Sequence, residues 1–383
     1  MNFIPFSLPE INADEINAVS NVLRSGWLTS GPCVNKFESE FTSFLGLKNV
    51  EAIAVNSATS GLHLALEAFG VGKGDSVITT THTFTATAEV IRYLGADPIF
   101  VDVCDDSLCI DVSKIEEKVR ANTKAIIPVH FAGLSCDMKS IIKIAKKFGL
   151  KILEDAAHAL PCTFGEQNIG SLKTDATVFS FYANKTMTTG EGGMLITSNK
   201  DIANRARVMR LHGINRDAFD RFTSKVPSWY YEVVAPGFKY NMTDISAAIG
   251  IHQLKKVNDF QQRRQEIAVR YSSEFKSLPL KLPLHPSSSD IHAWHLYVIR
   301  LNDDAPLSRD EFIEKMFEMN IGCSVHYVPL HLHPYWRDTY KLTPDMFPVS
   351  HKAYEQSVSL PIYSKMSDED VSKVISSVKS LLS

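Results

Sequence analysis

The chain has 383 residues, 44% of them hydrophobic and 22% charged, with a formal net charge of −3. That length suits one large and one smaller domain, and the charge gives no reason to expect nucleic acid or a membrane surface as a partner. Six scattered cysteines without a C-x-x-C pair argue against a disulfide framework and a zinc ribbon. The N-terminus lacks a signal-peptide pattern, and no apolar run approaches the ~18 residues that span a bilayer. We therefore expect a cytoplasmic protein with reduced thiols.

Apolar strands alternate with amphipathic helices over the first two-thirds of the chain. Strands that are apolar throughout, separated by helices, indicate a mostly parallel sheet covered on both faces, which binds ligands at the carboxyl ends of its strands. Helices are expected at 13–26, 32–46, 85–95, 112–120, 138–149 and 201–213, a strand followed by a helix at 52–71, and strands at 75–80, 97–103, 124–133, the start of 150–159, 175–181 and 193–198.

The last third of the chain has a different pattern. A single long helix capped by Thr243 is expected over 243–278, and the Pro- and Ser-rich stretch 279–290 is the best candidate for a linker. After it we expect a strand at 294–301, a helix at 308–319, a strand at 322–328 and a last helix that begins with a capping box at Ser367. The predicted domains are a large one, residues 1–254, and a small α+β one, residues 255–383.

Two short motifs lie where the sheet should bind a ligand. Asp155, in "EDAAH", follows a buried strand, so its carboxylate either needs a cationic partner or caps the next helix. "SATSG" (57–61) lies between a strand and a helix, where free N–H groups and hydroxyls attract phosphate, although a plain capped turn would have the same sequence.

A third motif is "SFYANKTMTTGEGGM" (180–194), in which Lys185 follows Ser180 at the end of a strand. An isolated loop lysine is usually a solvated surface charge, but a desolvated lysine amine forms a Schiff base with an aldehyde. Pyridoxal phosphate needs a phosphate cradle, an anion at its ring nitrogen and a lysine for its aldehyde. The order and positions of the three motifs fit that one cofactor.

Further motifs extend the pattern over nearly the whole chain: "SGWLTSGP" (25–32), "GDSVITTTHTFTATAEV", "TKAIIPVHFAG", "APGFKYNMTDISAAIG" and "SLPIY" (359–363). With them the chain resembles the DegT/StrS family of sugar-nucleotide aminotransferases. The resemblance implies an α/β, fold-type-I pyridoxal phosphate enzyme with a seven-stranded, mostly parallel sheet. The branch that it resembles is that of the UDP-4-amino-4-deoxy-L-arabinose synthases, although Phe84 in "THTFTATAE" departs from that branch.

The resemblance also implies roles for matching residues. Lys185 would bind the cofactor covalently and carry the proton, Asp155 would pair with the ring nitrogen, and His158 would lie near the ring oxygen or the Asp155 carboxylate. Phe84 would stack on the ring, and Asn241 would reach the phosphate of the neighbouring subunit's cofactor, which implies a homodimer with shared active sites. The cofactor phosphate would be held by Ser180, Ala58 and Thr59.

The sequence signals for residues that contact the substrate are less specific than those for the cofactor. In relatives the region of "SVHYVPLHLHPYW" (324–336), mostly His326, contacts the nucleotide-sugar. Trp27 and Thr29 are candidates for the base or the pyrophosphate, with core packing as the alternative for Trp27, and Arg216 is a candidate for a carboxylate or diphosphate. A metal at His326, His331 and His333 would lack a cysteine or carboxylate ligand, so no metal is expected.

The implied activity moves an amino group from L-glutamate, released as 2-oxoglutarate, to a nucleotide-linked 4-keto (6-deoxy) sugar for cell-surface polysaccharide or glycan biosynthesis. A dehydratase offshoot of the family has histidine in place of the lysine, so Lys185 favours transamination. The alternatives are a 3-keto sugar or GDP-sugar (perosamine-type) aminotransferase, a cysteine desulfurase, and a non-catalytic regulator of the same fold.

Overall fold

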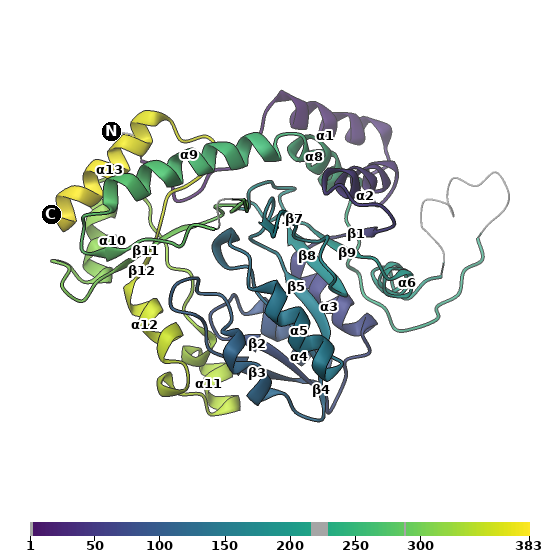
Figure 1. The fold of residues 1–383 in the computed structure, drawn as a ribbon. Coiled ribbons are helices and arrows are strands. Elements are labelled where there is room, and N and C mark those ends of the chain that lie inside the picture. The colour runs from purple at the N-terminus through teal and green to yellow at the C-terminus, as the bar shows by residue number, and fades with distance from the viewer. Residues whose placement is uncertain (1–2, 216–228, 287–288) are drawn as a thin grey trace.

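The structure, a computed structural model, describes residues 3–215, 229–286 and 289–383. Its centre is a seven-stranded sheet of order β1-β9-β8-β5-β4-β2-β3, in which β9 runs antiparallel to both of its neighbours and the other strands are parallel (Figure 1). This confirms the predicted mostly parallel sheet. The strands are β1 (Glu51–Val55), β2 (Ser76–Thr80), β3 (Asp97–Val101), β4 (Thr123–Ile126), β5 (Lys151–Asp155), β8 (Ala176–Ser180) and β9 (Gly193–Thr197).

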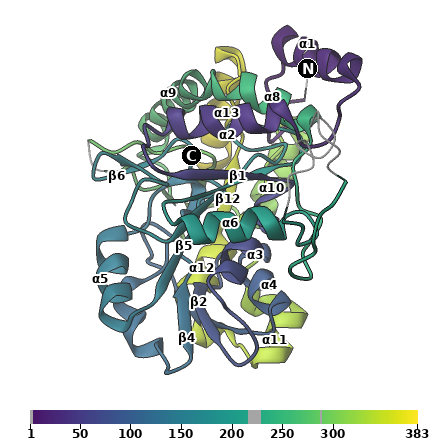
Figure 2. The same ribbon diagram turned by 90° about the vertical axis from the view of Figure 1, so that its right-hand side faces the viewer.

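Helices cover both faces of this sheet, as the apolar strands require. One face packs against α3 (Ala58–Ala68), α4 (Ala86–Tyr93) and α6 (Lys200–Met209). The other face packs against α2 (Pro32–Phe44), α5 (Met138–Phe148) and α8 (Asp244–Leu254), while α1 (Ala13–Ser25) lies against α8 (Figure 2). With both faces buried, ligands reach the sheet at its carboxyl edge.

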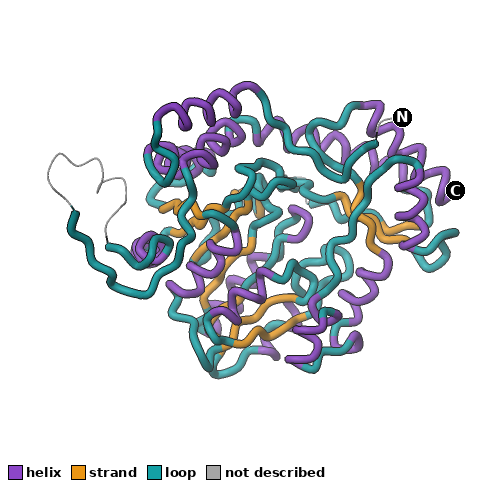
Figure 3. Tube along the Cα trace, turned by 180° about the vertical axis from the view of Figure 1, so that it is seen from behind, coloured by secondary structure: helices purple, strands orange, loops and turns teal. Residues whose placement is uncertain are grey.

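The C-terminal part forms a second layered unit beside the sheet (Figure 3). A three-stranded antiparallel sheet, β10 (Leu280–Lys281), β11 (Tyr297–Leu301) and β12 (Ser357–Leu360), shares a core with α9 (Val257–Phe275), α10 (Arg309–Glu318) and α13 (Asp368–Leu382). Two shorter helices, α11 (Pro334–Tyr340) and α12 (Pro348–Gln356), follow the cavity-facing segment, and the remaining short hairpin is β6 (Thr163–Phe164) with β7 (Gln167–Asn168).

Two helix predictions are wrong. The segment 112–120 forms two 3-10 turns, Val112–Lys114 and Glu116–Lys118, because Ile115 is its one fully buried anchor and a short helix needs an apolar face to be stable. The segment 243–278 is two helices, α8 and α9, separated at Lys255 and Lys256. The interruption lets α8 pack on the large sheet and α9 on the small one.

Two strand predictions are also wrong in extent. The expected strand 124–133 ends at Ile126, after which the chain becomes irregular and reaches a 3-10 turn at Phe131–Gly133. The expected strand 322–328 makes a single isolated bridge, Ser324 with Ser359, and the bridge of Ile4 with Ile321 lies just before it. Ser324 therefore lies beside β12, which pairs with β11, and the chain beyond Ser324 reaches the cavity at His326 and Tyr327.

The domain boundary after residue 254 remains a prediction. It coincides with the break between α8 and α9, but Ile4 packs in the core of the C-terminal unit, so the chain enters that unit at its start as well. None of the described helices is both long and apolar enough to cross a membrane.

Candidate active site

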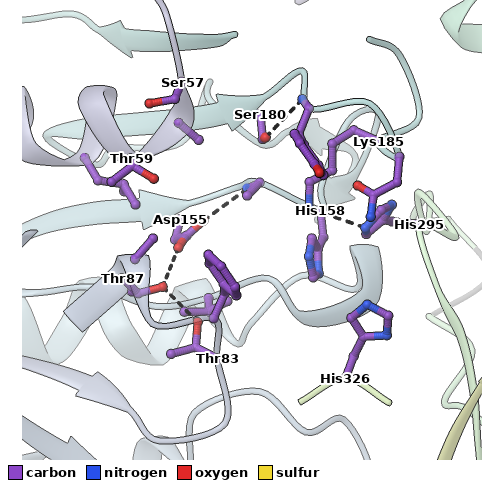
Figure 4. A pocket seen from close by; sticks show the side chains of 18 of the residues that line it. Ser57, Thr59, Thr83, Thr87, Asp155, His158, Ser180, Lys185, His295 and His326 are labelled. Carbon is purple, nitrogen blue, oxygen red and sulfur yellow. Dashed lines mark hydrogen bonds between the residues drawn. The ribbon is translucent and has the colours of Figure 1, made fainter. Parts of the chain in front are cut away.

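A cavity of about 510 Å³ opens at the carboxyl edge of the large sheet. One wall, the sheet-side wall, consists of the start of α3, the ends of β5 and β8 and the loop after β8. The other, the C-terminal wall, comes from the C-terminal unit and includes His295, His326 and Tyr327 (Figure 4). The volume lies in the range of small-molecule sites. Of the sequence-predicted residues, the cavity brings together Ala58, Thr59, Phe84, Asp155, His158, Ser180, Lys185 and His326.

One end of the cavity is a cradle for an anion. The first N–H groups of α3 have no partner within the helix, so those of Ala58 and Thr59 are available to a ligand. The Ser57 hydroxyl caps the same helix. Gly193 pairs with both Val55 and Ser180, and a Cβ there would lie 2.7 Å from the Ala58 nitrogen. Glycine is therefore required to bring β9 this close to the helix start.

Asp155 ends β5 with its side chain turned into the cavity (Figure 4) and is 5% exposed. Its Oδ2 accepts a hydrogen bond of 2.8 Å from the Thr87 hydroxyl, which also contacts Thr83, and its Oδ1 accepts one of 3.2 Å from the Ala157 N–H. Burial raises the pKa of Asp155 against these hydrogen bonds. An ionised carboxylate here calls for a cationic ligand.

Lys185 is a cavity residue and not a solvated surface charge. It lies in the loop between β8 and β9, where its N–H bonds the Tyr182 carbonyl, and its amine faces the same space as Asp155. Desolvation lowers the pKa of Lys185 to about 8, while the Asp155 charge acts in the opposite direction. The amine is thus available as a nucleophile near neutral pH.

His158 has both ring nitrogens engaged by the protein. Nδ1 accepts a hydrogen bond of 3.2 Å from the Ala132 N–H, so Nε2 carries the proton and donates to the Tyr327 hydroxyl at 2.8 Å. Burial holds the pKa of His158 well below its usual value, and the ring is neutral. The implied position near the ring oxygen or Asp155 is compatible with this placement, but the hydrogen bonds go to Ala132 and Tyr327.

Ser180, at the end of β8, is also a cavity residue, and its Oγ accepts a hydrogen bond of 3.4 Å from the Tyr182 N–H. The last two predicted cavity residues, Phe84 and His326, contribute rings to the lining. Phe84 is 61% exposed although it is aromatic, and its ring centroid lies 6.1 Å from that of Tyr327. His326 places Nδ1 2.8 Å from the Ser359 hydroxyl, and burial lowers its pKa to about 4. Both present side chains that a flat or ring-shaped ligand can contact.

Three predicted residues lie outside the cavity of this single chain. The Asn241 amide donates to the Ser30 hydroxyl at 2.8 Å, the Trp27 indole N–H donates to the Ser30 carbonyl at 3.1 Å, and Thr29 is exposed nearby. They form a separate cluster near the start of α8. Arg216 lies outside the described residues.

The three histidines considered as metal ligands point in different directions. His326 lines the cavity, His331 stacks on Phe347 with Nδ1 3.3 Å from the Thr81 hydroxyl, and His333 bonds the Val328 carbonyl. Within residues 3–215, 229–286 and 289–383, no three histidine, cysteine or acidic side chains are grouped to hold a metal ion.

Several functional positions were missed from sequence. Thr87 fixes Asp155, and Tyr327 bonds His158. His295, just before β11, places its Nε2 3.4 Å from Lys185 Nζ. Thr87 lies three residues after Phe84, in the motif "THTFTATAE", so the sequence alone could have identified it. His295 has no such signal, because it enters the cavity from a distant, irregular segment.

These donors fit the cofactor that the resemblance implies. Pyridoxal phosphate requires an anion cradle, a carboxylate for a protonated ring nitrogen and an amine for its aldehyde. The start of α3, Asp155 and Lys185 supply them around one cavity. Burial raises the pKa of Asp155, and a positively charged ring beside it would favour the ionised carboxylate.

Comparison with known proteins agrees with this site. The DegT/DnrJ/EryC1/StrS aminotransferase family matches residues 9–379. The spore coat polysaccharide biosynthesis protein SpsC of Bacillus subtilis is 47% identical over 383 residues, which is 100% of this chain and 97% of SpsC.

Solved structures of sugar aminotransferases superpose on nearly the whole chain. The PLP-form of the putative sugar aminotransferase Spr1654 from Streptococcus pneumoniae has a TM-score of 0.90 at 32% identity, with 100% of both chains covered. Helicobacter pylori PseC, an aminotransferase involved in the biosynthesis of pseudoaminic acid, has a TM-score of 0.92 at 30% identity and covers 100% of this chain and 99% of its own. The chain therefore belongs to the DegT/DnrJ/EryC1/StrS family of pyridoxal phosphate-dependent aminotransferases.

Proposed function

We propose that the enzyme moves an amino group from L-glutamate to a nucleotide-linked 4-keto (6-deoxy) sugar, in the cytoplasm, for a cell-surface polysaccharide or glycan. The observation that carries the proposal is the desolvated Lys185 amine in one cavity with the buried Asp155 carboxyl. The relatives support the substrate class, since Spr1654 is described as a putative sugar aminotransferase, PseC as an aminotransferase involved in the biosynthesis of pseudoaminic acid, and SpsC as a spore coat polysaccharide biosynthesis protein. The six free thiols of the chain support the compartment.

In this proposal each residue of the sheet-side wall has one task. When bound, the cofactor supplies an aldehyde that exchanges amino groups and a ring that accepts electrons. Lys185 would hold the cofactor through its aldehyde, and its free amine would take a proton from the donor carbon as base and return it as acid. Asp155, fixed by Thr87, keeps the ring nitrogen protonated. The start of α3 and the Ser180 hydroxyl hold the phosphate, and Phe84 covers the ring.

The sugar and its nucleotide are proposed to enter past the C-terminal wall. His326 and Tyr327 line the cavity mouth there, and the neutral His326 ring can exchange hydrogen bonds with sugar hydroxyls. His158 keeps Tyr327 in place through its Nε2 hydrogen bond. Arg216 remains a proposed contact for a carboxylate or diphosphate.

We propose further that the working form is a homodimer with shared active sites. Lys185 is the only lysine or arginine among the described residues lining the cavity, whereas the cofactor phosphate and the donor's carboxylates bring several negative charges. A second subunit would add polar groups from the cluster of Asn241, Trp27 and Thr29. Sedimentation and cross-linking of the purified protein test this: a monomer that is fully active would contradict it.

The substrate proposal is tested with two half-reactions. The protein is first mixed with glutamate alone, and the absorbance of the lysine-bound cofactor is followed; its loss with release of 2-oxoglutarate is expected. The aminated enzyme is then offered UDP-, dTDP- and GDP-linked 4-keto-6-deoxy sugars and a 3-keto sugar. Return of the absorbance with a 4-keto sugar supports the proposal, and return only with the 3-keto sugar overturns the position of amination.

A further inference from the structure

His295 faces Lys185 from the opposite wall of the cavity (Figure 4). Its imidazole is 4% exposed, and its Nε2 lies 3.4 Å from Lys185 Nζ. Its Nδ1 has no hydrogen-bond partner within the described residues, so the lysine amine is the one hydrogen-bond partner of this ring in that part of the chain, although the His158 ring lies 4.3 Å away between centroids. A buried polar ring with a single polar partner indicates that the partner is the reason for its placement.

The backbone that carries His295 is held in an unfavourable conformation. Trp294, the residue before it, has a φ of +48°, a left-handed conformation that is rare for a bulky aromatic residue. Such a conformation persists only where the surroundings fix it, and it is found preferentially at functional sites. The Trp294 ring stacks on His292 at 3.9 Å, and its indole N–H donates to Gln265.

The side chain of Arg264, on α9, fixes the backbone of the same segment through hydrogen bonds. Its guanidinium is 3% exposed and donates to the carbonyls of Trp294 at 3.0 Å and of His295 at 3.3 Å. A third hydrogen bond of 2.7 Å goes to the Ile362 carbonyl. A buried arginine whose hydrogen bonds within the described structure all go to backbone carbonyls acts to fix this chain segment.

The position of His295 suits a lysine that must act as a base. A neutral imidazole can accept a hydrogen bond through Nε2, and burial keeps the pKa of His295 well below its usual value. Acceptance by Nε2 fixes an N–H of the lysine and leaves the nitrogen lone pair available to take a proton from the substrate carbon. A donor at the same place would occupy that lone pair.

We propose that His295 is a positioning residue for Lys185, whose Nε2 accepts a hydrogen bond from the free lysine amine and holds it in place for proton transfer. The proposal rests on Lys185 being the reacting amine, as in the proposed function. It adds a group from the C-terminal unit to the chemistry of the sheet-side wall. In the reaction the Lys185 nitrogen would take the proton from the donor carbon and later give it up, and His295 itself would not be protonated.

Two substitutions of His295, with polar side chains of different length, test the proposal. In His295→Gln the amide oxygen can take the place of Nε2, whereas in His295→Asn the same group is too short to reach Lys185. His292→Asn is the control, because it loosens the stacked Trp294 segment without touching Lys185. Thermal melting of all three variants reports any loss of structure separately.

The first measurement uses cofactor-free protein and no substrate. Trace acetic anhydride labelling over a range of pH, followed by mass spectrometry of the Lys185 peptide, gives the pKa of that amine. Asp155, His158 and His326 also face the lysine and are unchanged in every variant. His295→Asn should lower the pKa, because an acceptor stabilises the ammonium form, and the ratio of neutral to protonated amine at pH 7 should rise roughly tenfold. His295→Gln and His292→Asn should match the wild type, and equal values in all four proteins would overturn the proposal.

The second measurement uses the holoenzyme in a single turnover with glutamate and with α-deuterated glutamate. His295→Asn should slow the turnover about 10- to 100-fold, with a larger isotope effect and an unchanged half-saturating glutamate concentration. His295→Gln should restore most of the rate. A slowed turnover without a larger isotope effect, or an equal slowing in His292→Asn, would make the role of His295 structural only. If glutamate fails to react even with wild type, the proposed function fails while the labelling result still decides the hydrogen bond.

Discussion

The two walls of the cavity are built in different ways. The sheet-side wall presents Asp155, Ser180 and Lys185 at or just after the ends of regular strands, where the backbone is fixed by the sheet itself. The C-terminal wall presents His295 and His326 from irregular segments that need buried hydrogen bonds to hold them. The ionisable Lys185 and Asp155 are thus on the wall with the more regular backbone, and the imidazoles of His295 and His326 are on the other. We expect substitutions in the first wall to abolish chemistry and those in the second to tune it.

Loss of the lysine amine should have the largest effect. Lys185→Ala removes the group proposed to bind the cofactor and move the proton, so turnover should fall at least about 10⁴-fold. Borohydride reduction followed by peptide mapping should label Lys185 in the wild type and give no label in the variant. Normal activity of Lys185→Ala, or a label on another residue, would contradict the assignment of chemistry to this wall.

Loss of the Asp155 charge should have the second-largest effect on turnover. Asp155→Asn keeps the shape but removes the anion that favours a protonated ring, and the rate of each half-reaction should fall roughly 10²- to 10³-fold. Thr87→Val removes the 2.8 Å hydrogen bond to Asp155, together with the Thr83 contact, and leaves the Asp155 charge, so the rate should fall about tenfold or less. Stopped-flow absorbance measures both, and a Thr87→Val loss equal to that of Asp155→Asn would show that orientation, and not charge, is decisive.

A substitution in the C-terminal wall should affect the keto-sugar half-reaction more than the glutamate half-reaction. His326→Ala should leave the glutamate half-reaction nearly unchanged and weaken the keto-sugar half-reaction by about 10-fold, through loss of a hydrogen bond at the cavity mouth. The comparison of half-saturating concentrations for the two substrates is the readout. An equal loss in both half-reactions would show that His326 belongs functionally with the sheet-side wall.

The smallest expected effect is on how the free energy of unfolding changes with pH. The folded pKa of Lys185 is about 8, against 10.5 for the free side chain, so between these values the folded cofactor-free protein binds fewer protons than the unfolded chain. The contribution of this lysine to stability therefore rises with pH over that window, by at most about 1.4 kcal/mol per pH unit. Urea unfolding of cofactor-free wild type and Lys185→Met from pH 7.5 to 10.5 should show this difference in slope. Parallel curves would mean that the lysine is solvated.

The sequence by itself determined the sheet and the wall that the sheet carries. Apolar strands alternating with helices require burial on both faces, and a residue just after a parallel strand necessarily lies at the binding edge, which placed Asp155 and Ser180. The motif around Lys185 follows the end of β8 in the chain, so it needed no long-range information. The parallel core and the cofactor could therefore be predicted from local patterns of residues.

Only the tertiary structure decided the second wall. His295 lies 110 positions from Lys185 in sequence and reaches it because Arg264 and the strained Trp294 direct an irregular segment into the cavity. The division of 243–278 into α8 and α9 likewise depends on which sheet each half packs against. Local periodicity reports which side of a helix or strand is buried. It carries no information on which distant segment buries it, and that pairing is settled by packing over the whole fold.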